Sequence, residues 1–343
     1  MPTYTNVGKF QRIERLGAGA FGEVYKALDT RLLQYRALKI VLSSLTGGDF
    51  EEQMQEAQRL VACRHRHIVD VKEADYLSVD GQKRVCIAYE LLSRGSVEKS
   101  ISDGVYYSPF KASNTISQAL FGLEHLHLLQ PPVLHRDIKP GNLLIGDSGD
   151  IKISDFGLAT LAASGAASPV GYAIHMAPEL LNGGQASVLS DIYAMGVTYY
   201  RVLNQVREMA DAAPMDFRSR ILRGKFPDRS AYRIAVPDQI RRICNKAMNP
   251  DPRRRYQSAG EFRQALERLS WQNRWDQISP HQWTALSGQV PLSLTATTGG
   301  RVWRVELRKN GRRIDRYASS FQDEARAIQE LEKIVAETGF TQL

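Results

Sequence analysis

Two short stretches near the middle of the chain gather the residue types that phosphoryl transfer needs. The first is His135-Arg136-Asp137-Ile138-Lys139-Pro140-Gly141-Asn142, and the second, a short distance later, is Asp155-Phe156-Gly157. Asp137 can accept a proton from an attacking hydroxyl, and Lys139 can neutralise a phosphate. Asn142 and Asp155 offer the hard oxygen ligands that Mg²⁺ prefers. A lone Asp-Phe-Gly arises by chance, but the two stretches in this order and spacing do not readily do so.

In these two stretches the chain resembles the protein kinase superfamily. The resemblance implies an α+β, bilobal fold and transfer of the γ-phosphoryl group of Mg·ATP to a hydroxyl of a protein substrate. It implies that Asp137 orients this hydroxyl, while Asn142 and Asp155 hold Mg²⁺. Lys39 and Lys139 would hold phosphates, so that catalysis would be mostly positioning and charge neutralisation. The lysine within the Asp-Ile-Lys-Pro run is typical of the serine/threonine class.

A glycine-rich segment near the N-terminus fits the pattern G-x-G-x-x-G-x-V, from Gly17 to Val24. Alone this pattern is a weak signal, because ordinary hairpins also use glycines. A dinucleotide-binding fold would continue with a helix, whereas Glu23 to Ala27 continues as a strand. This favours a glycine flap whose backbone amides approach phosphates closely. By the kinase resemblance, the nucleotide contacts in this segment come from Leu16, Gly17, Gly19, Gly22 and Val24.

Lys39 lies in an apolar strand, where a solvated lysine would fit poorly. Glu56 follows in a stretch from Phe50 to Cys63 whose apolar residues recur at helical spacing, and it lies next to that apolar stripe. The kinase resemblance pairs Glu56 with Lys39, which would then hold the α- and β-phosphates. A solvated helix glutamate stays an open alternative, because two other glutamates precede it in the same stretch.

A buried strand that ends at Leu92 leads into a polar, glycine-containing break. This break resembles the hinge between the two lobes of a kinase. By that resemblance, backbone groups of Glu90 and Leu92 bind the edge of the adenine, and Tyr89 guards the back of the pocket. Three apolar side chains would enclose the purine, although they are otherwise simply core residues: Val24, Ala37 and Leu144.

Residues 158–176 form a loop rich in Gly, Ala and Ser that resembles the activation segment of kinases. Arg136 offers a guanidinium partner for a phosphate on this loop. The loop departs from the serine/threonine pattern in one respect, because Tyr172 stands where a threonine is usual, and this leaves the choice of substrate open. The candidate sites of autophosphorylation are Thr160, Ser164 and Ser168.

Two further residues match kinase positions with structural roles. Asp191 matches the aspartate that braces the catalytic loop from a central helix. Arg255 matches the arginine that pairs with Glu179 at the end of the activation segment. With these two, the resemblance covers residues 8–269, the expected protein kinase domain.

The composition is that of an ordinary globular protein, with 343 residues, 43% hydrophobic and 24% charged, and a net charge of +8. Cys63, Cys86 and Cys244 are widely spaced among apolar neighbours, which predicts buried free thiols rather than disulfides or a metal site. We find no signal sequence and no apolar run of about eighteen residues. We therefore expect a cytoplasmic protein with no membrane contact.

After the kinase-like part, the character of the sequence changes twice. Residues 270–298 place Trp271, Trp275 and Trp283 among Gln, Ser and Pro, which predicts a linker packed on the kinase surface through its aromatic rings. Residues 299–343 then predict a small α+β accessory domain.

The accessory domain is expected to be a strand, a hairpin and a helix. Apolar and charged residues alternate from Val302 to Arg308, Asn310-Gly311 is a strong hairpin turn, and residues 312–318 read as a second strand. A helix is expected from Ser320, with Asp323 at the capping position. Its predicted apolar stripe is Phe321, Ala325, Ile328, Leu331 and Val335.

This layout weakly resembles the arm-type DNA-binding domains of phage integrases and the related AP2-like plant transcription-factor fold. Residues 301–316 hold seven Arg or Lys against two acids, which suits phosphate contacts. Exposed strands are often basic, however, and the following helix is acidic. Contact with a regulatory protein therefore stays open beside DNA binding. A catalytically weak kinase scaffold is the remaining alternative.

Overall fold

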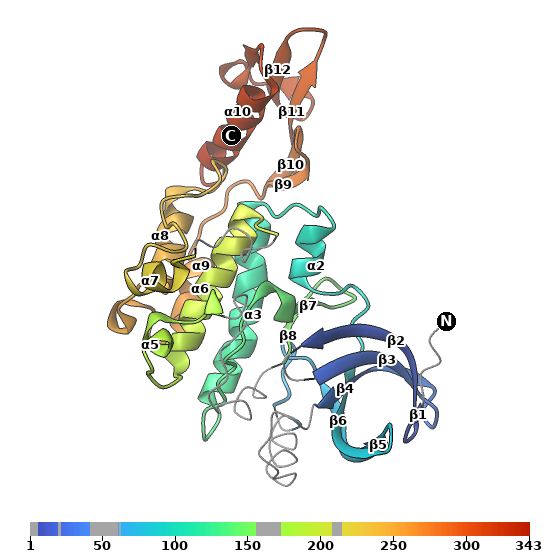
Figure 1. Ribbon diagram of the computed structural model, residues 1–343. Helices are drawn as coiled ribbons and strands as arrows, with labels where there is room; N and C mark the ends of the chain where they lie inside the picture. Colours follow the sequence, from blue (N-terminus) through green and yellow to red (C-terminus); the bar gives the residue numbers. More distant parts are fainter. Residues whose placement is uncertain (1–5, 20–21, 42–60, 62, 156–172, 208–214) are drawn as a thin grey trace.

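The computed structural model describes the chain except residues 1–5, 20–21, 42–60, 62, 156–172 and 208–214. The described part comprises an N-terminal β-sheet lobe, a larger helical lobe and a C-terminal unit of strands and one helix (Figure 1). This confirms the expected bilobal α+β architecture with a C-terminal appendage.

The N-terminal lobe is a six-stranded antiparallel sheet in the order β1-β2-β3-β4-β6-β5. Leu38 and Ile40 in β4 join the core of this lobe, so Lys39 between them points to the opposite face of the strand. The strands are β1 (Asn6–Val7), β2 (Phe10–Gly19), β3 (Gly22–Asp29), β4 (Gln34–Val41), β5 (Val71–Val79) and β6 (Gln82–Glu90).

The large lobe is organised around α6 (Val188–Asn204), whose side chains are buried nearly all the way round. A helix that is apolar on every side must lie inside the protein. It begins at a capping box, in which Ser187 and Ser190 satisfy each other's backbone amides. The other helices of this lobe are α2 (Val97–Ser102), α3 (Pro109–Leu128), α5 (Pro178–Leu181), α7 (Phe217–Leu222), α8 (Asp238–Ala247), α9 (Ala259–Glu267) and the 3₁₀ turn η4 (Pro252–Arg254).

The segment between the lobes contains the predicted catalytic residues. A 3₁₀ turn, η2 (Pro140–Asn142), leads directly into the short hairpin of β7 (Leu143–Ile145) and β8 (Ile151–Ile153). Both strands belong to the large core cluster, so the loop before them is held on a buried support. The three cysteines are buried and free, as expected.

The C-terminal unit contains a second six-stranded sheet with the path β13-β12-β11-β10-β9, and β14 pairs with β12. Helix α10 (Glu324–Thr338) packs on one face of this sheet (Figure 1). The remaining elements are β9 (Asp276–Ser279), β10 (Gln282–Ser287), β11 (Val290–Thr298), β12 (Trp303–Lys309), β13 (Arg312–Arg313), η5 (Asp315–Tyr317) and β14 (Ser319–Phe321).

The structure differs from the linker expected at residues 270–298, because β9, β10 and β11 lie within this range and pair in one sheet with β12. Trp275 and Trp283 are buried in the core of the C-terminal unit instead of lying on the kinase-like surface. Strands such as β11 are rich in Ser and Thr and bury only one face, so their sequences hold few apolar residues from which a strand could be predicted. We therefore propose that the unit begins near Trp271.

Two other details of the C-terminal unit differ from expectation. The hairpin turn is present, with positive φ at Asn310 and Gly311, but the second strand has only two residues before the chain turns into η5. The helix begins at Glu324, capped by Asp323, whose carboxylate accepts from the Ala325 amide at 2.7 Å. Its buried face is Ala327, Leu331, Ile334, Val335 and Thr338, so the predicted stripe is right at Leu331 and Val335, while Phe321 packs against the same core from β14.

No helix in the described part of the chain is long and apolar enough to cross a lipid bilayer.

Candidate active site

Three of the predicted residues meet around the Asp137 carboxylate, which is 7% exposed. Lys139 donates from Nζ to both carboxylate oxygens of Asp137, at 3.1 and 2.8 Å. Asn142 donates from Nδ2 to Oδ2 of Asp137 at 2.9 Å and to its backbone carbonyl at 2.7 Å. The carboxylate is therefore oriented by two neighbours on the same loop.

Asp155 and Lys39 meet at the junction of the two lobes. Nζ of Lys39, from the sheet lobe, forms an ion pair with Oδ1 of Asp155, from the end of β8. Burial by itself raises the pKa of the Asp155 carboxyl, but the adjacent Lys39 ammonium outweighs it and the pKa lies below its ordinary value. Asp155 is therefore ionised at neutral pH, as a metal ligand must be.

The loop that carries Asp137 is anchored by Asp191 at the start of α6. The backbone amides of His135 and Arg136 donate to its two carboxylate oxygens at 2.8 and 2.9 Å. Nε2 of His127, on α3, lies 2.9 Å from Oδ2 of Asp191. Arg136 has a φ of +64°, a left-handed conformation that is rare for a bulky residue and that these contacts hold in place.

Backbone pairing places the glycine segment opposite Lys39. Gly17 pairs with Val24, and Val24 pairs with Lys39, so the three residues lie in a row on one face of the sheet. A Cβ added at Gly17 would meet no atom within 4 Å. Gly22 pairs with Gly19 and has a φ of +149°, and a Cβ there would lie 2.2 Å from the carbonyl oxygen of Ile40. Leu16 is about half exposed at the start of this segment.

The residues expected to enclose the adenine lie where the sheet meets the large lobe. Two of the three side chains expected to enclose the purine, Ala37 and Leu144, are half-buried against the large core cluster, and so is Leu92 of the expected hinge. Glu90 ends β6, and its carboxylate accepts from the Asp70 amide at 2.8 Å and pairs with Lys152 at 2.7 Å. These side-chain contacts fix the end of β6, and the expected adenine contacts of Glu90 and Leu92 stay a prediction.

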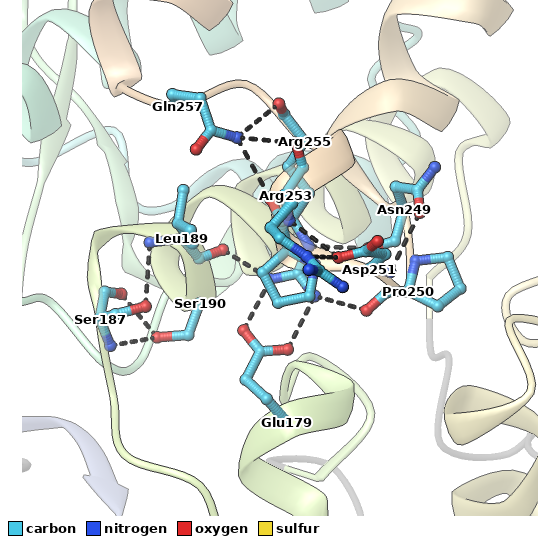
Figure 2. Close-up of polar contacts among 11 residues, drawn as sticks. Glu179, Ser187, Leu189, Ser190, Asn249, Pro250, Asp251, Arg253, Arg255 and Gln257 are labelled. Atoms are coloured by element: carbon cyan, nitrogen blue, oxygen red, sulfur yellow. Dashed lines mark hydrogen bonds and ion pairs between the residues drawn. The ribbon is translucent and has the colours of Figure 1, made fainter.

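Arg255 and Glu179 form a bidentate ion pair, with both nitrogen–oxygen distances at 2.7 Å (Figure 2). Arg255 also donates to the carbonyls of Leu189, Asn249 and Pro250, and its side chain is fully buried. These donations satisfy the buried guanidinium, which would otherwise be costly. The pair ties the end of the candidate activation segment to the first turn of α6.

Several expected residues lie outside the described part of the chain. They include Glu56, the Phe156-Gly157 pair, Tyr172, and the candidate phosphosites Thr160, Ser164 and Ser168. The Lys39–Glu56 pair accordingly stays a prediction.

The donor set of the site fits a hard divalent cation. Asn142 uses its amide nitrogen on Asp137, which leaves its side-chain oxygen Oδ1 as the atom for a metal. The Ser154 amide donates to the Asn142 carbonyl at 2.9 Å, which places Asp155 next to Asn142. One neutral and one anionic oxygen donor are typical of Mg²⁺ sites that also use substrate phosphates.

Sequence reasoning missed some polar contacts that support the site. His127 had no metal-ligand spacing and no other local signal, so its contact with Asp191 was not foreseen. Likewise, Arg201 is a buried cation on α6 that pairs with Glu98 of α2 at 2.7 Å. Neither pair has a signature along the chain, because its members are 64 and 103 residues apart.

Comparison with known proteins gives the family. A family model described as the protein kinase domain matches residues 10–269. The chain belongs to the protein kinase family. Among curated relatives, the kinase is 29% identical to the serine/threonine-protein kinase PrkC of Bacillus subtilis over 264 residues, which are 74% of this chain and 39% of PrkC. It is 27% identical to the serine/threonine-protein kinase PknB of Mycobacterium tuberculosis, covering 76% of this chain and 43% of PknB.

A solved structure of similar fold is the kinase domain of Mycobacterium tuberculosis PknI, with a TM-score of 0.59 and 22% identity. The match covers 78% of this kinase and 98% of the PknI domain. The chain spans about two fifths of the length of the two curated relatives. The comparisons support the kinase resemblance and give no support to the DNA-binding resemblance of residues 299–343.

Proposed function

We propose that this kinase transfers the γ-phosphoryl group of Mg·ATP to serine or threonine hydroxyls of protein substrates. The observation that carries the proposal is the constellation at the lobe junction, where Lys139 and Asn142 orient Asp137 while Lys39 pairs with Asp155. Two observations support serine and threonine as the acceptor residues. Relatives of this kinase are named serine/threonine kinases, and a lysine stands two residues after Asp137.

Each residue has a separate task in the proposed reaction. Asp137 accepts a hydrogen bond from the attacking hydroxyl and orients its oxygen, and Lys139 neutralises charge that develops on the transferred group. Lys39 holds phosphates of ATP from the sheet side. Asn142 and Asp155 would hold Mg²⁺, which when bound neutralises the phosphate oxygens.

The test is transfer of labelled γ-phosphate from Mg·ATP to peptide libraries that contain Ser, Thr or Tyr as the only acceptor. We expect transfer to Ser and Thr libraries by the wild-type protein, and transfer by Asp137→Asn that is lower by about 10²-fold or more. Transfer to the Tyr library alone would contradict the acceptor class. Equal signals from wild-type and Asp137→Asn protein would contradict the assigned role of Asp137.

We also propose autophosphorylation within residues 158–176, because Arg136 beside the catalytic aspartate can pair with a phosphate. Mass spectrometry of wild-type and Asp137→Asn protein tests this. An active wild-type enzyme without phosphate in this segment would contradict it.

A further inference from the structure

Arg201, near the end of α6, is a buried cation for which the proposed reaction has no role. It is 4% exposed. Its Nη2 donates to Oε1 of Glu98 on α2 at 2.7 Å and to the Arg207 carbonyl at 3.0 Å. Its Nη1 lies 3.3 Å from Nε2 of His175, in the segment before α5. Because α6 is packed inside the core, these contacts hold the guanidinium group at a fixed position.

Glu98 connects Arg201 to the loop that carries Asp137. The side chain of Glu98 is 38% exposed, and Arg201 holds one of its two oxygens. The other oxygen, Oε2, lies beside the loop, because a Cβ built on Gly141 would be 2.7 Å from it and 3.8 Å from Cε of Lys139. Helix α2 also packs on η2, which contains Gly141. The Glu98 carboxylate and the Lys139 side chain are therefore neighbours on the same side of this glycine.

This proximity allows two carboxylates to compete for Lys139. In the structure Lys139 donates to both oxygens of Asp137. An ammonium group has three donors, so Lys139 can also bind a second carboxylate within its reach. A Glu98 side chain released by Arg201 is such a carboxylate. It would neutralise the Lys139 charge before a phosphate could use it, and would draw the ammonium group away from Asp137.

We propose that Arg201 is a positioning residue that holds Glu98 away from Lys139 and so keeps the Lys139 ammonium group for the transferred phosphoryl group. The inference rests on the proposed kinase activity, in which Lys139 neutralises charge on that group. A hydrogen bond between two charged groups is stronger than one to a neutral donor, so a neutral side chain at position 201 would hold Glu98 less firmly. The arginine is buried, so salt screens this pair less than it screens a surface pair.

A purely structural role for the pair, as a tie between α2 and α6, predicts a different response to substitution. If the pair is only a tie, loss of Arg201 breaks it, and a second substitution at Glu98 restores nothing. If Arg201 restrains Glu98, the harm done by losing Arg201 comes from the freed carboxylate. Removing the charge of Glu98 as well should then restore catalysis.

The first test measures kinetics of the full-length kinase with a serine peptide from the libraries described above. Arg201→Met should lower kcat by about tenfold or more and leave KM for ATP within about twofold, because Lys139 acts in the transfer step and Lys39 holds the nucleotide. The double variant Arg201→Met, Glu98→Gln should recover kcat to within about threefold of wild type. An unchanged kcat in Arg201→Met, or a double variant as slow as Arg201→Met, would overturn the proposal.

The double variant decides the question even where Arg201→Met alone does not fold, because it leaves neither charge of the pair without its partner. A folded double variant with a kcat far below wild type would overturn the proposal.

The matched control is Arg263→Met. It removes a mostly buried arginine that pairs with Glu124 and Glu267, on α3 and α9. This variant should lose stability in denaturant unfolding and keep its kcat. An equal fall in kcat in the control would mean that lost stability, and not the freed Glu98, slows the enzyme.

The second test reads the state of Lys139 without catalysis. An amine-acylating reagent at pH 8 is followed by mass spectrometry, with the exposed Lys333 on α10 as internal reference. Relative to Lys333, Lys139 should react several-fold more slowly in Arg201→Met than in wild type, because a nearby carboxylate favours the protonated amine. The double variant should react as wild type does.

Equal relative rates of acylation in wild type and Arg201→Met would overturn the proposal. If the rates differ as expected but the wild-type protein transfers no phosphate to any library, the proposed function fails and the positioning of Glu98 by Arg201 stands.

Discussion

At the scale of single residues, the contacts that each side chain makes determine its task in the proposed reaction. Lys139 and Asn142 hold Asp137, and Lys39 holds Asp155, so the two aspartates have different neighbours and different tasks. Asp137 faces the acceptor hydroxyl in the proposed reaction, whereas Asp155 belongs to the metal and phosphate side. Substitutions at the two positions should therefore be separable.

Asp137→Asn should reduce phosphate transfer by about 10²- to 10⁴-fold, because a positioned proton acceptor contributes this much to catalysis. Its affinity for Mg·ATP should stay within a few-fold of wild type. Asp155→Asn should lose both transfer and Mg²⁺-dependent nucleotide affinity. Calorimetric titration of Mg·ATP, with and without the metal, checks this. Equal nucleotide affinities of the two variants would contradict the division of roles.

The two glycines at the ends of the glycine segment should respond differently to alanine. Gly22→Ala forces a Cβ against the Ile40 carbonyl at a positive φ, so the free energy of unfolding should fall by about 1–3 kcal/mol. The methyl group of Gly17→Ala would contact no other atom, so the free energy of unfolding should stay unchanged. KM for ATP should rise, because the methyl group keeps phosphates away from the backbone. Denaturant unfolding and ATP kinetics of both variants measure this. A destabilised Gly17→Ala protein would be inconsistent with the open space at that position.

At the scale of elements, α6 organises the site without contributing a catalytic group. Its first turn carries Asp191, which holds the catalytic loop, and packs on Arg255, which binds Glu179 (Figure 2). The helix is buried along its whole length, so it cannot shift without disturbing the core. This helix therefore sets the position of the loop that carries Asp137.

Asp191 should make stability depend on acid pH. Burial raises the pKa of this carboxyl, but the hydrogen bond and charge of His127, with the Arg136 amide, outweigh burial and hold the pKa below the ordinary value of 3.8. A carboxyl whose pKa is lower in the folded protein than in the unfolded chain stabilises the fold. This stabilisation is complete at pH values above the ordinary pKa, and it is lost as the pH falls through the folded-state pKa.

The difference in unfolding free energy between wild type and Asp191→Asn should therefore be present at about pH 5 and shrink below about pH 4. Urea unfolding over this pH range measures it. Asp238→Asn, an exposed carboxylate at the start of α8, is the matched control and should show little difference at any pH. A difference for Asp191→Asn that grows with acidity would contradict the assigned direction.

At the scale of the whole molecule, the C-terminal unit is an extension of the large lobe instead of a tethered module. Trp271 and Arg233 join the unit to the start of α3 and to the segment before α8. The other end of α3 carries His127, which contacts Asp191. The helix that the unit contacts at its start therefore contacts, near its other end, the aspartate that holds the loop of Asp137.

Arg233→Ala and Glu332→Ala should each destabilise the protein, and the double variant should lose less than the sum of the two. We expect a coupling energy of about 0.5–3 kcal/mol, because the two side chains are in direct, mostly buried contact. A double-mutant cycle from denaturant unfolding of the full chain gives this value. Lys333, which is on the same helix but exposed, provides the control pair with Arg233 and should show no coupling. Additive effects for Arg233 and Glu332 would mean that the attachment does not stabilise the unit.

The sequence by itself determined the family, the fold class and most of the candidate site. This was possible because the predicted catalytic residues lie within short runs such as His135 to Asn142, where type and spacing are constrained together. Hairpin and cap signals were local as well, and the structure confirms the Asn310-Gly311 turn and the Asp323 cap. Such features depend on neighbouring residues, so one sequence is enough to read them.

Tertiary structure alone decided which distant groups meet. The pairs His127–Asp191, Arg201–Glu98 and Arg233–Glu332 join residues 64 to 103 positions apart, and charged residues at such separations have many potential partners. Residues 270–298 were predicted to be a linker because Trp271, Trp275 and Trp283 stand among Gln, Ser and Pro in the sequence. The strands within this range pair with β12, and their apolar side chains pack against α10. These contacts form only when the whole unit folds.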